Sequence, residues 1–314
     1  MRHHIFVAAL GLAALADAGH AQSSCRRCLD GFRFLPSSVV GDPFAITHFE
    51  NATGAGMAVN LNVPVRNVEG ATIDSLKGDI GFLLVDFGYQ YAVARWLALR
   101  ASVTAFGRVG TSTEAVVASG ASAAYGWTFG ATVPFLRRPS LLLSAVGDFR
   151  RSTEFDIDPF GFAQRIVDDS GYTPEAKQAL LSSDNTNRWS LGLRAAWAIA
   201  PWVGLNGELE TGGVDQSVSN SKSVTTFGAQ AGFDFGKLSR VPIGLSLAAF
   251  GQAGSGRTGN LSGGYRSYEL GLFYTGRPDF AIGGDFFLSR IASRNGDIPD
   301  LDGLQFRIVT KIDF

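Results

Sequence analysis

The chain closes on Gly303-Leu304-Gln305-Phe306-Arg307-Ile308-Val309-Thr310-Lys311-Ile312-Asp313-Phe314, and this stretch decides the fold. Successive side chains of a β-strand point to opposite faces, so every second residue shares a face. One face carries Leu304, Phe306, Ile308, Thr310, Ile312 and Phe314, and the other carries Gln305, Arg307, Val309, Lys311 and Asp313. The pattern predicts an amphipathic strand that ends on an aromatic carboxyl terminus. One such strand fits a soluble all-β protein as well as a membrane barrel, so repetition of the pattern must decide.

The two-residue period recurs along most of the chain. It is found in Met57–Val63, Leu83–Tyr91, Leu97–Ala105, Ala123–Val133, Leu141–Phe149, Trp189–Trp197, Val203–Leu209, Phe227–Phe235, Ile243–Leu247, Tyr268–Tyr274 and Phe280–Leu288. With the terminal strand these segments make twelve. A strand of about 9–11 residues is long enough to cross a bilayer when it is tilted.

The connections between these segments alternate in length. Short ones lie at residues 94–96, 136–139, 200–202, 236–240 and 276–279, and long ones lie near 65–78, 110–119, 155–187, 214–222, 255–263 and 293–302. An even strand number, with short turns on one side and long loops on the other, is typical of outer-membrane barrels. We therefore predict an all-β fold: a single antiparallel transmembrane β-barrel of about 12 strands with a helical external loop.

Composition agrees with one large all-β domain rather than with a nucleic-acid-binding protein. The chain has 314 residues, of which 18% are charged, with a formal net charge of −1. That charged fraction is below the roughly 25% that is usual for soluble domains. A near-zero net charge gives no reason to expect nucleic acid or an anionic membrane surface as a partner.

The first 21 residues have the pattern of a secretory signal peptide. Arg2, His3 and His4 form a short basic start, Ile5–Ala16 is apolar, and small residues precede a cleavage position after Ala21. Beyond them no run of about 18 apolar residues exists that would form a transmembrane helix. A chain exported by the Sec route that then enters a membrane must therefore do so as a closed barrel.

Residues 22–53 are interpreted as a periplasmic lead-in before the barrel of residues 54–314. Pro36, Gly41 and Pro43 make this segment irregular, and we expect it to lie in the barrel mouth. Whether residues 43–50 add a strand is left open. Cys25 and Cys28 form a C-x-x-C pair that either closes a local disulfide or stays reduced, since a redox motif needs a βαβ context that is absent.

From Met57 to Phe314 the chain resembles the Gram-negative outer-membrane β-barrel class, which includes porins. The soluble alternative requires an unusually large core to bury twelve apolar faces. Aromatic residues also gather at the short-turn ends of the strands, where an interfacial girdle is expected: Tyr89, Tyr91, Trp96, Trp197, Trp202, Phe233, Phe235, Tyr274, Phe280 and Phe314. The resemblance implies location in the cell outer membrane, contact with its lipid and lipopolysaccharide, and insertion by the outer-membrane assembly machinery. It also implies that Phe314 serves as the assembly signal.

The face opposite the apolar one is expected to line the lumen. It carries the ionisable residues Asp86, Arg100, Asp148, Arg150, Arg194, Glu208, Glu210, Asp234, Glu269, Asp285, Arg307 and Lys311. With Asp313, acids outnumber bases by eight to five, so a water-filled lumen would favour cations. Most of these groups are expected to form structural ion pairs.

No catalytic or metal site is predicted. An enzymatic barrel would need an imidazole base, and His48 is the one histidine beyond the leader, outside the periodic segments. No G-x-S-x-G motif is present, and zinc would need two ligands besides Cys25 and Cys28. We expect no cofactor and no enzymatic activity; a barrel enzyme that relies on His48 is the least favoured alternative.

The long connection at 155–187 predicts two short helices. Phe160, Phe162, Ile166 and Val167 recur at helical spacing, and Thr173-Pro174-Glu175 has the composition of a helix start. Such a loop either folds into the bore as a constriction or forms a surface cap. The favoured function is a porin-like channel for small solutes, and the alternative is a structural or surface-interaction barrel with a closed lumen.

Overall fold

The computed structural model describes residues 25–66, 72–112, 116, 121–157, 181–216, 219–239, 241–254, 265–291 and 301–314. The predicted signal peptide lies outside the described residues. So do the constriction candidates Phe160, Phe162, Ile166 and Val167 with their predicted helices. Within the described residues, no helix is long and apolar enough to span a membrane.

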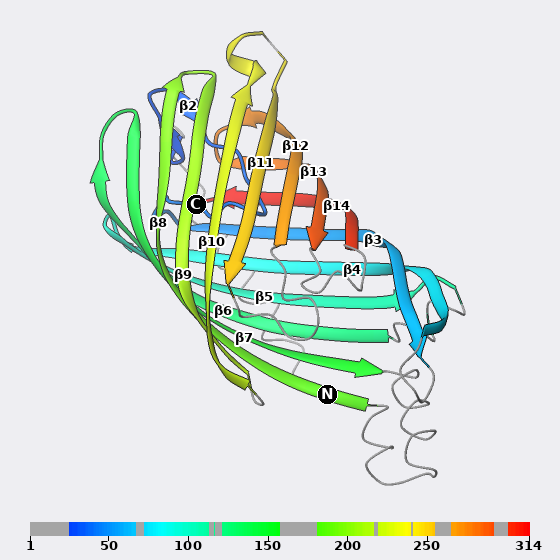
Figure 1. The fold of residues 1–314 in the computed structure, drawn as a ribbon. Coiled ribbons are helices and arrows are strands. Elements are labelled where there is room, and N and C mark those ends of the chain that lie inside the picture. The colour runs from blue at the N-terminus through cyan, green and yellow to red at the C-terminus, as the bar shows by residue number, and fades with distance from the viewer. Residues whose placement is uncertain are drawn as a thin grey trace, which may run out of the picture.

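Twelve antiparallel strands form one closed barrel (Figure 1). They are β3 (His48–Arg66), β4 (Thr72–Ala94), β5 (Leu97–Gly110), β6 (Ala121–Arg137), β7 (Leu141–Ile157), β8 (Leu181–Ala200), β9 (Val203–Gln216), β10 (Ser219–Asp234), β11 (Ile243–Gly254), β12 (Tyr265–Arg277), β13 (Phe280–Ile291) and β14 (Leu301–Asp313). Each strand pairs with its sequence neighbour, and β14 closes the barrel on β3, with Ile308 opposite Thr53. The predicted fold class and strand number are confirmed. A 3-10 turn, η1 (Phe235–Lys237), joins β10 to β11.

Several strands run further than the apolar period indicated. β3 begins at His48, so the barrel starts before residue 54, and residues 43–50 add no separate strand. The connection predicted at 65–78 is largely strand, because β3 ends at Arg66 and β4 begins at Thr72. The physical reason is that backbone pairing continues where alternation has stopped. In the polar ends of β7 and β8, for example, the Thr153 hydroxyl donates to Asn185 Oδ1 at 2.7 Å.

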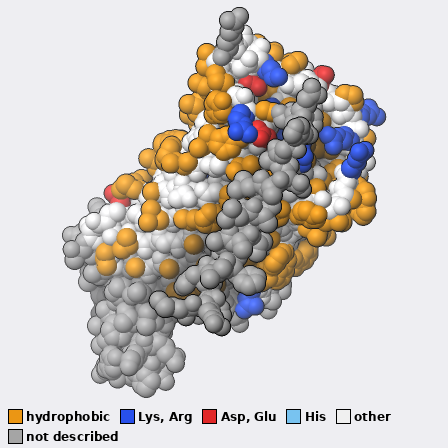
Figure 2. All heavy atoms as spheres, turned by 180° about the vertical axis from the view of Figure 1, so that it is seen from behind, with side chains coloured by type: hydrophobic (Ala, Val, Ile, Leu, Met, Phe, Trp, Pro, Cys, Tyr) orange, Lys and Arg blue, Asp and Glu red, His pale blue; other side chains and the backbone are white. Residues whose placement is uncertain are grey.

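The barrel is apolar outside and polar inside, the reverse of a soluble protein. Leu83 is 65% exposed and Leu191 62% exposed, whereas Ser144, Ser246 and Asp285 are fully buried. Hydrophobic side chains cover much of the face shown in Figure 2, where most of the visible charged side chains lie at one end. The exposed aromatic residues at the short-turn end, among them Tyr89, Tyr91, Trp96, Trp197 and Trp202, lie on the outer face as a girdle requires.

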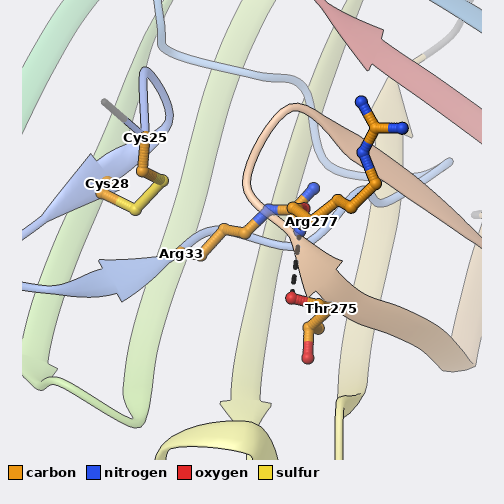
Figure 3. The surroundings of a disulfide bond; sticks show 5 residues. All are labelled: Cys25, Cys28, Arg33, Thr275 and Arg277. Atoms are coloured by element: carbon orange, nitrogen blue, oxygen red, sulfur yellow. Dashed lines mark hydrogen bonds between the residues drawn. A yellow bond between two sulfur atoms is a disulfide. The ribbon is translucent and has the colours of Figure 1, made fainter. Parts of the chain in front are cut away.

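Residues 25–47 lie inside the barrel at the short-turn end, and we call them the inner plug (Figure 1). Within it, β1 (Cys28–Leu29) and β2 (Phe32–Arg33) pair antiparallel. Their two-residue turn has positive φ at Asp30 (44°) and Gly31 (80°), the conformation that Asp-Gly favours in hairpins. Cys25 and Cys28 form a disulfide beside this hairpin (Figure 3).

The largest buried apolar cluster joins the inner plug to the barrel wall. Leu29, Phe32, Phe34 and Phe44 pack with Leu142 of β7 and with Ala196 and Ala198 of β8. The rings of Phe32 and Phe34 meet edge to face at 4.9 Å. Gly204 of the wall lies against these rings. A Cβ at this position would clash with the Phe32 ring and would lie 3.0 Å from a ring carbon of Phe34, so the packing requires glycine.

Candidate functional site: the charged lumen

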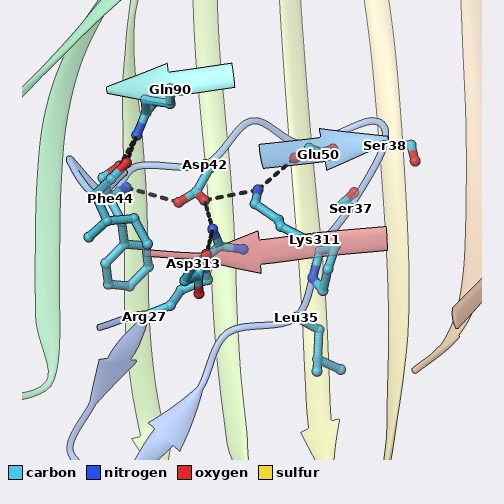
Figure 4. Close-up of polar contacts among 12 residues, drawn as sticks. Arg27, Leu35, Ser37, Ser38, Asp42, Phe44, Glu50, Gln90, Lys311 and Asp313 are labelled. Carbon is cyan, nitrogen blue, oxygen red and sulfur yellow. Dashed lines mark hydrogen bonds and ion pairs between the residues drawn. The ribbon is translucent and has the colours of Figure 1, made fainter. Parts of the chain in front are cut away.

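An ion-pair cluster fixes the inner plug to the first and last barrel strands (Figure 4). Asp42 Oδ2 lies 3.0 Å from Arg27 Nη2 and 3.1 Å from Lys311 Nζ. Arg27 Nη2 also pairs with Asp313 Oδ1 at 2.9 Å, and Lys311 Nζ with Glu50 Oε2 at 2.7 Å. Burial opposes ionisation of Asp42, but Arg27 and Lys311 outweigh it and hold the pKa of Asp42 well below its usual range.

Barrel side chains satisfy the backbone carbonyl groups of the inner plug. Gln90 Nε2 donates to Phe44 O at 2.7 Å and to Ile46 O at 2.9 Å. Ser144 Oγ donates to Pro43 O at 2.6 Å, and Gln230 Nε2 donates to Pro36 O at 3.1 Å. A buried irregular segment carries polar backbone groups that must find partners. These inward-facing amides and hydroxyls therefore specify where the plug lies.

Three predicted lumen carboxylates accept hydrogen bonds from the plug. Glu208 Oε2 accepts from Gly41 N at 2.6 Å, Glu269 Oε2 from Ser38 N and Ser37 Oγ at 3.1 Å each, and Asp285 Oδ2 from Ser38 Oγ at 2.9 Å. At the hairpin, Arg33 donates to the carbonyls of Thr275, at 3.5 Å, and of Arg277 (Figure 3). These contacts lie on β9, β12 and β13, and Ser144 of β7 contacts the plug from the opposite side of the barrel.

The other predicted lumen residues also lie on the inner side of the wall. Arg100 Nη2 pairs with Asp148 Oδ2 at 2.5 Å, and Arg194 Nη2 pairs with Glu210 Oε1 at 2.6 Å. Asp86 accepts from Thr104 Oγ1 at 2.5 Å, Asp234 from Thr275 Oγ1 at 3.0 Å, and the Arg307 guanidinium stacks 3.6 Å from the centre of the Phe287 ring. Arg150 faces the cavity described below.

A cavity of about 470 Å³ lies between the inner plug and the barrel wall. Its ionisable lining, His48 aside, comprises the bases Arg27, Arg100, Arg150, Arg188, Arg194, Arg307 and Lys311 and the acids Asp42, Glu50, Asp86, Asp148, Glu208 and Glu210. Among the described residues, seven bases face six acids, which gives a net charge of +1. The acidic excess counted from the sequence is absent here, because Asp234, Glu269, Asp285 and Asp313 do not line this space.

Sequence reasoning missed several contributors to this site. Glu50 fell in the predicted lead-in, and Arg188 fell in the predicted connection at 155–187, although alternation from Arg194 back through Ser190 reaches it. Arg27 and Asp42 carried no local signal, because their partners are distant in sequence. His48 is buried, and its Nδ1 has no hydrogen-bond partner in the described part of the chain. Within the same residues no group of His, Cys, Asp and Glu side chains could hold a metal.

A polar, charged interior inside a closed strand wall with an apolar outer face defines a transmembrane β-barrel. No protein-family model matches the chain, and no curated protein sequence matches it. Among solved structures, the translocator domain of the autotransporter NalP from Neisseria meningitidis is similar with a TM-score of 0.54 and 11% identity, over 86% of this chain and 89% of that one.

Two further similar structures have lower scores. The beta domain of the Bordetella autotransporter BrkA has a TM-score of 0.48 and 10% identity, covering 86% of this chain and 100% of that one. The NanC porin has a TM-score of 0.48 and 6% identity, covering 84% of this chain and 100% of that one. The closed twelve-stranded barrel and its likeness to the NalP domain show the outer-membrane β-barrel fold, and at 11% identity that likeness concerns the fold alone.

Proposed function

We propose that the protein is an outer-membrane channel for small hydrophilic solutes and that its inner plug controls passage. The observation that carries the proposal is the charged cavity of about 470 Å³ between plug and wall. Charged side chains in such a space require water or a polar ligand, because an ion in a dry interior is strongly disfavoured. A hydrated charged lumen suits polar solutes better than apolar ones.

The plug can leave this position without loss of barrel backbone pairing. Each of the twelve strands pairs with its two neighbours in the barrel, and β14 pairs directly with β3. The plug joins the wall covalently only where Thr47 leads into β3, and its other described contacts with the wall are hydrogen bonds, ion pairs and apolar packing. A displacement therefore breaks side-chain contacts and leaves the closed ladder intact.

Deletion of residues 22–43, with the leader kept, tests the proposal. The variant is expected to insert as a folded barrel and to show higher single-channel conductance in planar bilayers than the full chain. A matched control replaces Ser37 and Ser38 by alanine, which removes two side-chain hydrogen bonds between the plug and the wall but keeps the bulk of the plug. A folded deletion variant without conductance would contradict the channel and favour the structural barrel with a closed lumen.

The remaining parts of the proposal concern location and partners. We propose Sec-dependent export, residence in the outer membrane in contact with lipid and lipopolysaccharide, and insertion by the assembly machinery through the strand that ends at Phe314. The Phe314 amide donates to Thr47 O at 2.9 Å, which places the end of the chain beside the start of β3. We propose no enzymatic activity and no cofactor. The loop constriction stays a prediction, since residues 158–180 lie outside the described residues.

A further inference from the structure

Two arginines in the cavity lie directly opposite each other on neighbouring strands. Arg150 of β7 and Arg188 of β8 are partners in the strand register, and both line the cavity. Directly opposed side chains have Cβ atoms only about 4.5–5.5 Å apart, and like charges at that spacing destabilise a sheet. Two opposed guanidinium groups are therefore unfavourable unless another group offsets their repulsion.

Most other cations of the cavity form ion pairs, and Arg307 stacks on the Phe287 ring, whereas in the described part of the chain Arg150 and Arg188 do neither. Arg27 and Lys311 share Asp42, Arg100 pairs with Asp148, and Arg194 pairs with Glu210. Among the described residues, neither Arg150 nor Arg188 has a carboxylate oxygen within the 4.0 Å of an ion pair.

The carboxylates on this part of the wall already form ion pairs with other arginines. Asp148 pairs with Arg100 at 2.5 Å and lies 3.5 Å from Arg194, which also pairs with Glu208 at 3.5 Å and with Glu210 at 2.6 Å. Among the described residues, the cavity lining from β5 to β9 therefore holds four arginines, Arg100, Arg150, Arg188 and Arg194, against three carboxylates. The surplus positive charge belongs to the Arg150–Arg188 pair.

Hydroxyl groups extend the same row across the sheet. Thr128 of β6 is the register partner of Arg150, and Ser102 of β5 is the register partner of Thr128. All four side chains line the cavity, so two hydroxyl donors continue the line of two guanidinium donors. A row of hydrogen-bond donors that includes two positive charges is suited to bind the oxygen atoms of an anionic group.

We propose that Arg150 and Arg188 form a binding site for a carboxylate or phosphate group of a solute in the lumen. The planar guanidinium fork of arginine pairs with either group through two parallel hydrogen bonds. An anion between the two arginines also removes their mutual repulsion. The site rests on the proposed channel function and gives its substrate class: small anionic solutes, the opposite of the cation preference expected from the sequence.

Binding to the folded barrel in detergent tests the site without requiring an open channel. Isothermal titration with inorganic phosphate and with malonate distinguishes a phosphate from a carboxylate preference. Replacement of both arginines by glutamine (R150Q/R188Q) is expected to weaken binding of the preferred anion at least tenfold. The matched control R290Q removes a positive charge from the exposed Arg290, which does not line the cavity, and is expected to bind like the parent chain.

Two results would overturn the site: no binding of either anion by the parent chain, or equal affinity in R150Q/R188Q. Heat-modifiable migration of both variants first verifies that they are folded. Reversal potentials across a KCl gradient then test the channel separately, and R150Q/R188Q is expected to shift ion selectivity towards K⁺. Anion binding that depends on the two arginines, together with no conductance from the plug-deleted barrel, would support the site and contradict the channel.

Discussion

Lys311 of the last barrel strand and Asp42 of the inner plug form an ion pair of 3.1 Å. The same Asp42 oxygen lies 3.0 Å from Arg27, so one carboxylate separates two cations that are both nearly buried. Lys311 is in turn held by Glu50 at the start of the barrel. This chain of charges links the plug to the strand pair β14–β3 that closes the barrel.

Replacement of Asp42 by asparagine should therefore destabilise the plug position. D42N removes the negative charge between Arg27 and Lys311. Removing one partner of a fully buried ion pair costs about 3–5 kcal/mol. The cost here is smaller, because water in the cavity partly solvates the two cations. We expect more frequent or longer channel openings in planar bilayers. A suitable control is D279N, which removes an exposed turn carboxylate that pairs with Arg277. Identical opening of D42N and the parent chain would show that the cluster does not hold the plug.

The depressed pKa of Asp42 gives a pH dependence with a definite sign. A carboxylate whose pKa is lowered in the folded state stabilises that state fully above its unfolded pKa of about 3.9 and loses this contribution as the pH falls through the folded value. Asp42 should therefore keep the plug in place from neutral pH down to about pH 4. Glu50 and Asp313 face the same cations, so the comparison of D42N with the parent chain isolates the share of Asp42. Below about pH 4 the difference in opening between the two should shrink. A difference that grows on acidification would contradict this assignment.

Arginine on the lipid face should harm assembly more than arginine on the lumen face. Ile308 is 54% exposed on the outer wall of β14, whereas Gln305 on the same strand lies on the opposite, inward face. A charge at mid-depth on the lipid side costs about 2–4 kcal/mol, and a charge in the lumen is solvated. I308R should therefore give a lower yield of folded barrel in lipid vesicles than Q305R. Equal yields would contradict the facing of this strand.

The barrel should be heat-modifiable in detergent. Its ladder is closed, so no strand edge is available from which unfolding can begin, and unheated samples should migrate differently from boiled ones on a gel. The plug-deleted variant should behave in the same way, because the plug adds no strand to the barrel. The same migration before and after boiling, with folding verified by circular dichroism, would contradict a closed barrel.

The barrel could be predicted from the sequence because its signal is local. Within each strand, the alternation of apolar and polar residues indicates which side chains point outward. In β14, Leu304, Phe306 and Ile308 form the apolar set, and all three are exposed on the outer wall. The strand ends were predicted less well. Beyond the apolar band, pairing depends on a partner strand rather than on hydrophobicity, and Asn185 and Thr153 pair without any apolar period.

The sequence by itself determined the antiparallel barrel, the number of its strands and the inward direction of its charged residues, because side-chain alternation and turn spacing are short-range properties. Only the tertiary structure decided which charges meet. Arg27 and Asp313 are 286 residues apart and hydrogen-bond at 2.9 Å, and the acids counted as a cation-selective lining are largely bound to arginines or to the inner plug. Closure of the barrel brings β14 beside β3, and the register between β7 and β8 sets Arg150 opposite Arg188. Such contacts depend on register and burial, which no single stretch of sequence specifies.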